Sequence, residues 1–205
     1  FHTVHIDLVG PLPPSEGNRY LVTMIDRFSR WTEVVPVKDM STETVVDAFL
    51  RNWVSRFGVP RTLISDRGAQ FESALWGSLM SKLNIERRRT TSYHPQCNGA
   101  IERFHRSLKN ALRAHCEGHN WCKALPLVML GLRTAVSKEG FSPSQLVYGS
   151  SLELPTSFFI PREPKLAKPT MEYLDKFFDE VKNLPSPQRN TSINSFVPTG
   201  LDTAS

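Results

Sequence analysis

The sequence predicts an α/β fold in which helices cover a mixed β-sheet. In residues 1–40, short runs alternate apolar and polar side chains or are rich in β-branched and aromatic residues, as strands are. Apolar residues then recur at helical spacing over 41–57, and a further strand and helix follow over 62–83. Three strands followed by helix, strand and helix are typical of a mixed sheet with covering helices.

The first strand already separates two faces. Val4, Ile6 and Leu8 alternate with His5 and Asp7, and because side chains alternate along a strand, Asp7 points away from the face that carries the three apolar residues. Runs at 20–25 and 31–37 predict the second and third strands, joined by a polar link over 26–30.

Helical periodicity begins after Ser41, a suitable N-cap, and ends before Gly58 and Pro60. The remaining elements follow from the same patterns: a strand at 62–65, a helix at 71–83, a strand at 86–91, a loop at 93–99, and helices from about 101 to 113, 121 to 133 and 142 to 148.

The composition changes near residue 155. We expect a core domain over 1–155, followed by a Pro/Ser-rich extension over 156–205 that is linker or disordered, apart from one short amphipathic helix near 171–183. The chain opens on Phe1 and shows no targeting signal, so we expect a segment of a larger polyprotein. No apolar run approaches the ~20 residues of a membrane span, and three cysteines favour a reducing compartment.

Positive charge is concentrated in one segment. The chain carries a net charge of +5, and residues 86–113 alone hold seven basic and two acidic residues. Glu102, Arg106, Lys109 and Arg113 share one face of the helix predicted there. A stripe of this kind indicates a polyanion partner, and a solvated helix face is the alternative.

Three acidic residues are candidate metal ligands. Asp7 lies on a polar strand face, Asp66 directly follows a strand, and Glu102 lies near the start of the basic helix. Carboxylate oxygens are the ligands that Mg²⁺ prefers. Two such ions could activate a nucleophile and stabilise the leaving oxygen of a phosphoryl displacement, whereas three unrelated surface acids would do neither.

The spacing and the surrounding motifs resemble those of retroviral-type integrases. Thirty-five residues separate Asp66 from Glu102, as in that family's Asp, Asp, 35, Glu signature. HIDLVGP at 5–11, DRFSRW at 26–31, SDRGAQF at 65–71, YHPQCNG at 93–99 and LVYG at 146–149 are similar to the Pol integrase of gypsy-type LTR retrotransposons. Several ordered blocks in one register carry more weight than a single motif.

The resemblance implies an RNase H-like five-stranded mixed sheet flanked by helices. It also implies a polynucleotidyl transferase with endonuclease activity, which processes the 3′ ends of retroelement DNA and transfers them into target DNA. Asp7, Asp66 and Glu102 would be catalytic and would bind Mg²⁺ or Mn²⁺, as two ions. A homo-oligomer, dimer or tetramer, acting in the nucleus after a cytoplasmic particle stage, is implied, with no membrane partner.

DNA contacts carried over from the family fall on Tyr93, Gln96, Asn98, Arg106 and Lys109, and Arg113 shares the basic helix face. The family's zinc domain and C-terminal DNA-binding domain are not within this sequence, so we do not expect this segment to integrate DNA by itself. A non-catalytic nucleic-acid-binding remnant, or a host-domesticated module, is therefore the alternative function, and an RNase H-type nuclease is a third.

Other candidates have structural interpretations. His115, Cys116, His119 and Cys122 are too crowded for a structural zinc site. We expect Asp26 to serve a turn or pair with arginine, and Trp31, Trp53 and Trp76 to lie in the core rather than stack on bases.

Overall fold

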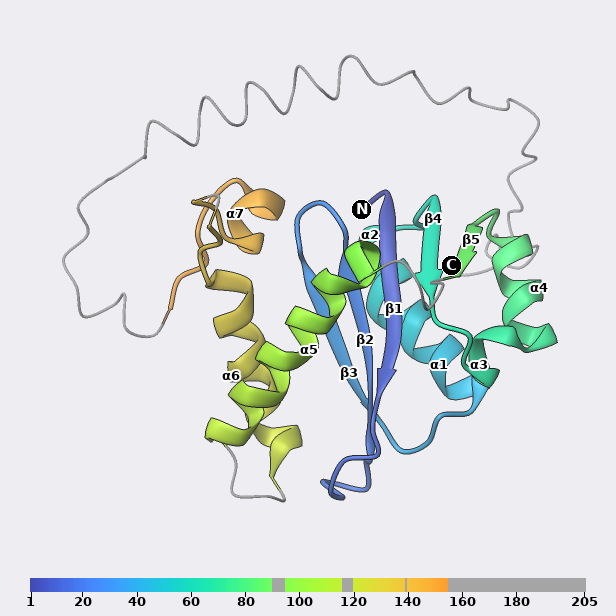
Figure 1. The fold of residues 1–205 in the computed structure, drawn as a ribbon, viewed down its shortest axis with the longest axis horizontal. Coiled ribbons are helices and arrows are strands. Elements are labelled where there is room, and N and C mark those ends of the chain that lie inside the picture. Colours follow the sequence, from blue (N-terminus) through green and yellow to red (C-terminus); the bar gives the residue numbers. More distant parts are fainter. Residues whose placement is uncertain (90–94, 116–119, 139, 155–205) are drawn as a thin grey trace, which may run out of the picture. The chain divides into compact units, whose positions relative to one another are not determined.

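A five-stranded mixed sheet forms the centre of the fold (Figure 1). The structure, a computed structural model, describes residues 1–89, 95–115, 120–138 and 140–154, with the backbone alone described at 95–100 and 115. All but Leu154 of these lie in one compact unit, Phe1–Glu153. The strands are β1 Thr3–Val9, β2 Tyr20–Asp26, β3 Thr32–Val37, β4 Thr62–Ser65 and β5 Glu86–Arg89.

The sheet order is β3-β2-β1-β4-β5. β2 pairs antiparallel with both β1 and β3, whereas β4 pairs parallel with both β1 and β5. The three parallel strands β1, β4 and β5 therefore end at the same edge. The predicted five-stranded mixed sheet is confirmed.

Helices follow the strands in the predicted order. They are α1 Thr42–Phe49, the π-helical turn η1 Leu50–Val54, α2 Ser55–Phe57, α3 Ala69–Glu72, α4 Ala74–Lys82, α5 Pro95–His115, α6 Trp121–Thr134 and α7 Pro143–Tyr148. Ser41 caps α1 by accepting a hydrogen bond from the Thr44 backbone N–H, as expected from its position. No helix within the described ranges is long and apolar enough to cross a membrane.

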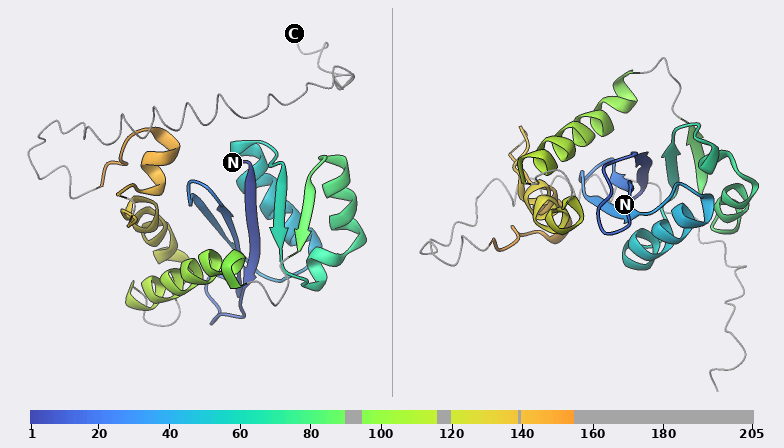
Figure 2. Two further views of the ribbon diagram at one scale, coloured as in Figure 1. Left: turned by 45° about the horizontal axis from the view of Figure 1, so that its top comes forward. Right: turned by 90° about the horizontal axis from the view of Figure 1, so that it is seen from below.

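The two faces of the sheet carry separate cores. On one face, Val4, Ile6 and Met24 pack with buried residues of α1, η1 and α4, including Phe49, Trp53 and Trp76. On the other face, Val9 and Leu21 pack against α5 and α6 through residues that include Leu108, Leu112, Trp121 and Leu125. Figure 2 shows α1 and α5 on opposite sides of the strands. The Asp7 face is thus covered by α5 and α6.

Two element boundaries differ from the sequence prediction. The single helix expected over 71–83 is interrupted at Ser73, which adopts an extended conformation (φ −67°, ψ 154°) and caps α4 by accepting from the Trp76 N–H. The region 95–99, predicted as loop, begins α5. A proline suits the first turn of a helix because the N–H that it lacks would have no partner there.

The structure confirms the turn role predicted for Asp26 and the core position predicted for three tryptophans. Asp26 Oδ2 accepts hydrogen bonds from the Ser29 N–H and hydroxyl at 2.7 Å each, so Asp26 orders a turn. Trp31, Trp53 and Trp76 are buried in the core. Among the crowded zinc candidates, Cys116 and His119 lie outside the described residues, and of His115 only the backbone is described. The helix expected near 171–183 also lies outside the described residues.

Candidate active site

Asp7 and Asp66 come together because their strands are parallel neighbours. Val4 pairs with Leu63 and His5 with Ile64, so continuing that register two residues brings Asp66 level with Asp7. Adjacent strands lie about 4.8 Å apart, and paired residues point to the same face. Two acids that are 59 positions apart in the sequence are thereby placed side by side at the carboxyl edge of the sheet.

Glu102 reaches the same place from α5. One cavity of about 130 Å³ is lined by Asp7, Asp66, Glu102 and His105, together with Ile6, Ile64, Ser65 and Ile101. The structure therefore brings all three predicted metal ligands to the wall of a single cavity. His105 lies one helical turn beyond Glu102, so both side chains share one face of α5.

Asp7 is held in a partly dehydrated environment. Its Oδ1 accepts a hydrogen bond from the Leu8 N–H at 2.7 Å, and its side chain is 27% exposed. Burial, and to a lesser extent repulsion from Asp66, raise the pKa of Asp7 to about 6, against the lowering effects of the Leu8 hydrogen bond and Lys109. A nearby cation would offset this cost because it favours the ionised carboxylate.

His105 connects α5 to the central strands. Its Nε2 lies 2.9 Å from Thr23 Oγ1, and its Nδ1 lies 3.8 Å from Asp7 Oδ2. Burial, with a smaller effect of Lys109, lowers the pKa of His105 to about 4, so the imidazole is neutral near pH 7. His105 was not predicted from the sequence, although its position three residues after Glu102 was a usable signal.

The donor chemistry of the cavity suits a hard divalent cation. Ionised carboxylates only accept hydrogen bonds, and carboxylate oxygens are the preferred ligands of Mg²⁺ and Mn²⁺. Within the described residues, however, no three His, Cys, Asp or Glu side chains are close enough together to hold an ion as they stand. Binding by all three acids therefore requires the exposed side chains of Asp66 and Glu102 to reorient.

A basic groove adjoins this cavity along α5. Its lining combines Glu102 and His105 with Arg106, Lys109, Asn110 and Arg113. The side chains of Arg106, Lys109 and Arg113 are exposed. The groove and the cavity share Glu102 and His105, so the positive charge lies directly beside the carboxylates.

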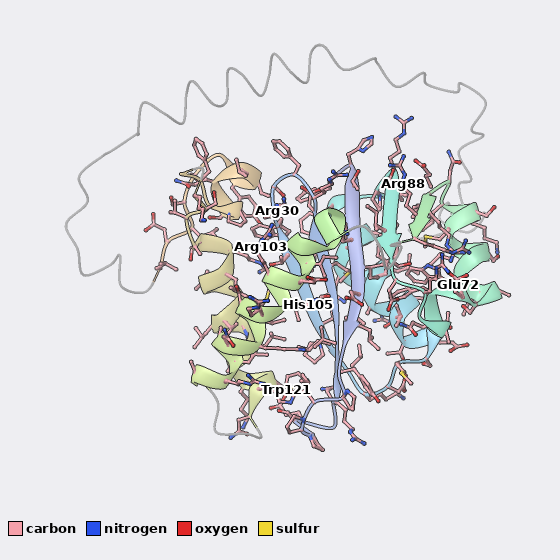
Figure 3. All side chains as sticks on the ribbon, in the orientation of Figure 1. Arg30, Glu72, Arg88, Arg103, His105 and Trp121 are labelled. Atoms are coloured by element: carbon pink, nitrogen blue, oxygen red, sulfur yellow. The ribbon has the colours of Figure 1, made fainter. Side chains whose placement is uncertain are left out.

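The other part of the basic segment is largely neutralised. Arg89 makes two hydrogen bonds to Glu72, at 2.7 and 2.8 Å, and Arg87 lies 3.7 Å from the same carboxylate. Arg88 pairs with Glu86 at 2.9 Å. Figure 3 shows Glu72 and His105 on opposite sides of the central strands. The basic surface beside the cavity is consequently the α5 face rather than the whole 86–113 segment.

Part of the predicted DNA-binding set is outside the described structure. Tyr93 lies in an undescribed segment, and Gln96 and Asn98 lie in the first turns of α5, where only the backbone is described. Their predicted role stays a prediction.

The fold and the cavity define an α/β domain that places three carboxylates beside a basic groove. The family model "Integrase core domain" matches residues 1–95. The chain is 33% identical over 147 residues to the Gag-Pol polyprotein of koala retrovirus, a match that covers 70% of this chain. It is 30% identical over 162 residues, 77% of this chain, to the Pol polyprotein from transposon 412 of Drosophila melanogaster. The chain belongs to the integrase core domain family.

Solved structures show the same fold. The catalytic core domain of BIV integrase superposes with a TM-score of 0.59 at 23% identity, covering 71% of this chain and 92% of that one. The HTLV-2 integrase catalytic core domain in complex with magnesium gives a TM-score of 0.58 at 21% identity, covering 70% of this chain and 94% of that one. These likenesses confirm the RNase H-like fold of integrase catalytic cores.

The match covers a small part of the related polyproteins. This chain spans 9% of the koala retrovirus polyprotein and 13% of the transposon 412 polyprotein.

Proposed function

We propose that this chain is the catalytic core of a divalent-metal-dependent polynucleotidyl transferase, which processes the 3′ ends of retroelement DNA and joins them to target DNA. One observation carries the proposal. Asp7, Asp66 and Glu102, far apart in the sequence, line a single cavity that adjoins the basic groove of α5.

The three carboxylates would hold the metal ions, and each is positioned by a different element. Asp7 is fixed by β1 and its hydrogen bond from Leu8, Asp66 by the end of β4, where its Oδ1 accepts from the Gly68 N–H at 2.9 Å, and Glu102 by α5. A pair of Mg²⁺ or Mn²⁺ ions, when bound, would supply activation of the attacking oxygen and stabilisation of the leaving oxygen.

The α5 groove would position the nucleic acid. Arg106, Lys109 and Arg113 can neutralise backbone phosphates without reading sequence. Since the groove shares Glu102 with the cavity, a strand lying along it would pass beside the carboxylates. DNA as the substrate, a dimer or tetramer as the working assembly and the nucleus as the place of action are parts of the same proposal.

Metal-dependent cleavage of an element-end oligonucleotide tests this proposal. The chain, restored to its polyprotein neighbours, is incubated with labelled DNA and Mg²⁺, and Asp66→Asn is compared with Asp47→Asn. Asp47 is exposed on α1 and pairs with Arg51 of η1 at 2.6 Å, so it serves as a matched control. The proposal is supported if Asp66→Asn loses both 3′-end processing and joining to target DNA while Asp47→Asn keeps them. Undiminished processing and joining by Asp66→Asn would refute it.

A non-catalytic DNA-binding module is the second candidate function. It is favoured by one observation, that no three metal-ligating side chains in the described part of the chain are close enough to hold an ion. This candidate predicts DNA binding that is equally strong with EDTA and with Mg²⁺, together with no product from the full-length parent. Cleavage that depends on Asp66 rules it out.

A further inference from the structure

We propose that His105 is a positioning residue of the cation site: Thr23 fixes its ring so that Nδ1 faces Asp7, and the same bond ties the Glu102-bearing helix to the central strands. The inference rests on the proposed function, because it concerns the cavity assigned there to the metal ions. The inference adds two residues, His105 and Thr23, to the three carboxylates predicted from the sequence.

The hydrogen-bond directions at Thr23 orient the ring. Thr23 Oγ1 donates its single proton to the Asp7 backbone carbonyl oxygen at 3.2 Å. In the tautomer that carries its proton on Nε2, His105 donates from Nε2–H to this same oxygen at 2.9 Å. A neutral imidazole protonated at Nε2 carries a lone pair at Nδ1, so Nδ1 is an acceptor.

That acceptor lies beside the free oxygen of Asp7. Asp7 Oδ1 is occupied by the Leu8 N–H, and Oδ2 is the oxygen that lies 3.8 Å from His105 Nδ1. This separation is too long for a hydrogen bond, which agrees with two acceptors facing each other. His105 Nδ1 and Asp7 Oδ2 are then two acceptors that face each other on the wall of the cavity. A cation in the cavity, or a water molecule that it coordinates, would stabilise them in this position.

The Thr23 bond also sets the place of Glu102. Farther along α5, Leu108 and Leu112 anchor the helix to Val9 and Leu21. Near Glu102, His105 supplies a polar anchor to the sheet, and it reaches the residue of β2 that pairs with Asp7. One side chain therefore links the helix that carries Glu102 to β2, at the residue that pairs with Asp7 of β1.

Two substitutions separate the two contacts of the ring. The Asn side chain places an amide near the position of Nδ1, whereas the Gln side chain places one near Nε2. His105→Asn therefore keeps a polar group beside Asp7, His105→Gln keeps one beside Thr23, and His105→Ala keeps neither. Thr23→Val removes the hydroxyl from below the ring and leaves a side chain of similar shape.

The test measures Mn²⁺ affinity of the full chain without DNA, from the signal of free Mn²⁺ in electron paramagnetic resonance, with thermal unfolding measured in parallel. We expect His105→Ala and His105→Gln to weaken binding about tenfold or more, as loss of an outer partner of a metal site does. We expect His105→Asn to restore most of the affinity, and Thr23→Val to weaken it to a smaller extent.

Equal Mn²⁺ affinity in His105→Ala and the unaltered protein would overturn the inference. If His105→Ala does not fold, equal affinities of the Asn and Gln variants would overturn it instead. Absence of Mn²⁺ binding by the unaltered chain would refute the cation site and the role of His105 with it. Normal Mn²⁺ binding without any DNA cleavage by the full-length parent would refute the proposed function and leave the inference standing.

Discussion

Replacing Asp7 by asparagine is expected to stabilise the metal-free protein. The pKa of Asp7 is raised from 3.8 to about 6, first by burial. Each pKa unit corresponds to about 1.4 kcal/mol, so ionising this buried carboxylate costs about 3 kcal/mol at most. Because the side chain is 27% exposed, solvent screening reduces the expected gain to about 1–3 kcal/mol. Asparagine keeps an oxygen for the Leu8 N–H and removes the charge.

The gain depends on pH in a defined direction. The native pKa lies above the unfolded one, so between 3.8 and about 6 the native state retains a proton that the unfolded state has released. The contribution of Asp7 to the free energy of unfolding therefore falls as the pH rises through that window. Asp7→Asn should match the unaltered protein below about pH 4 and exceed it fully above about pH 7.

Urea denaturation in EDTA, followed by tryptophan fluorescence at both ends of this pH range, measures the effect. Adding Mg²⁺ should then stabilise the unaltered protein more than Asp7→Asn, because a ligand that binds the native state alone raises its stability. A variant that is less stable than the unaltered protein at high pH, or a difference that does not change with pH, would refute the reasoning.

Three further predictions concern the buried carboxylate of Glu33, the basic groove of α5 and the N-cap of α7. Glu33→Ala should lower the free energy of unfolding by about 3 kcal/mol in urea denaturation, because the buried carboxylate accepts from Arg133 at 2.8 Å and from Trp31 Nε1 at 3.1 Å; exposed Asp47→Ala should cost under about 1 kcal/mol. Replacing Arg106, Lys109 and Arg113 by Gln should reduce the slope of log DNA affinity against log salt concentration by about 3 in a filter-binding titration. An unchanged slope would exclude the groove as the surface that binds DNA phosphates. Ser142→Ala, which breaks the capping box of α7, should cost about 1 kcal/mol in thermal unfolding.

The order of elements could be predicted from the sequence because local patterns determine it. Alternation over Val4 to Leu8 and the helical repeat from Val45 to Phe57 are short-range signals, and the structure confirms both. The π-helical turn at Leu50–Val54 and the break at Ser73 carry no comparable signal. Both depend on how the helices pack on the sheet.

The three acids of the candidate site could be predicted from the sequence, whereas the contacts of the side chains around them could not. The 35-residue spacing and the motifs around Asp66 identified Asp7, Asp66 and Glu102, which the structure places around one cavity. His105 was missed because its importance depends on Thr23, which is 82 positions away. Pairing of Arg87 and Arg89 with Glu72 is also a long-range contact, so the sequence overstated the free positive charge of 86–113.

The convergence of Asp7, Asp66 and Glu102 on a divalent ion is tested most directly by diffraction from crystals soaked in Mn²⁺, using its anomalous signal. We predict a peak in the cavity between these three side chains, with Asp66 and Glu102 rotated toward it. A cavity without a peak at saturating Mn²⁺, or a peak held by other residues, would contradict the assignment of the site.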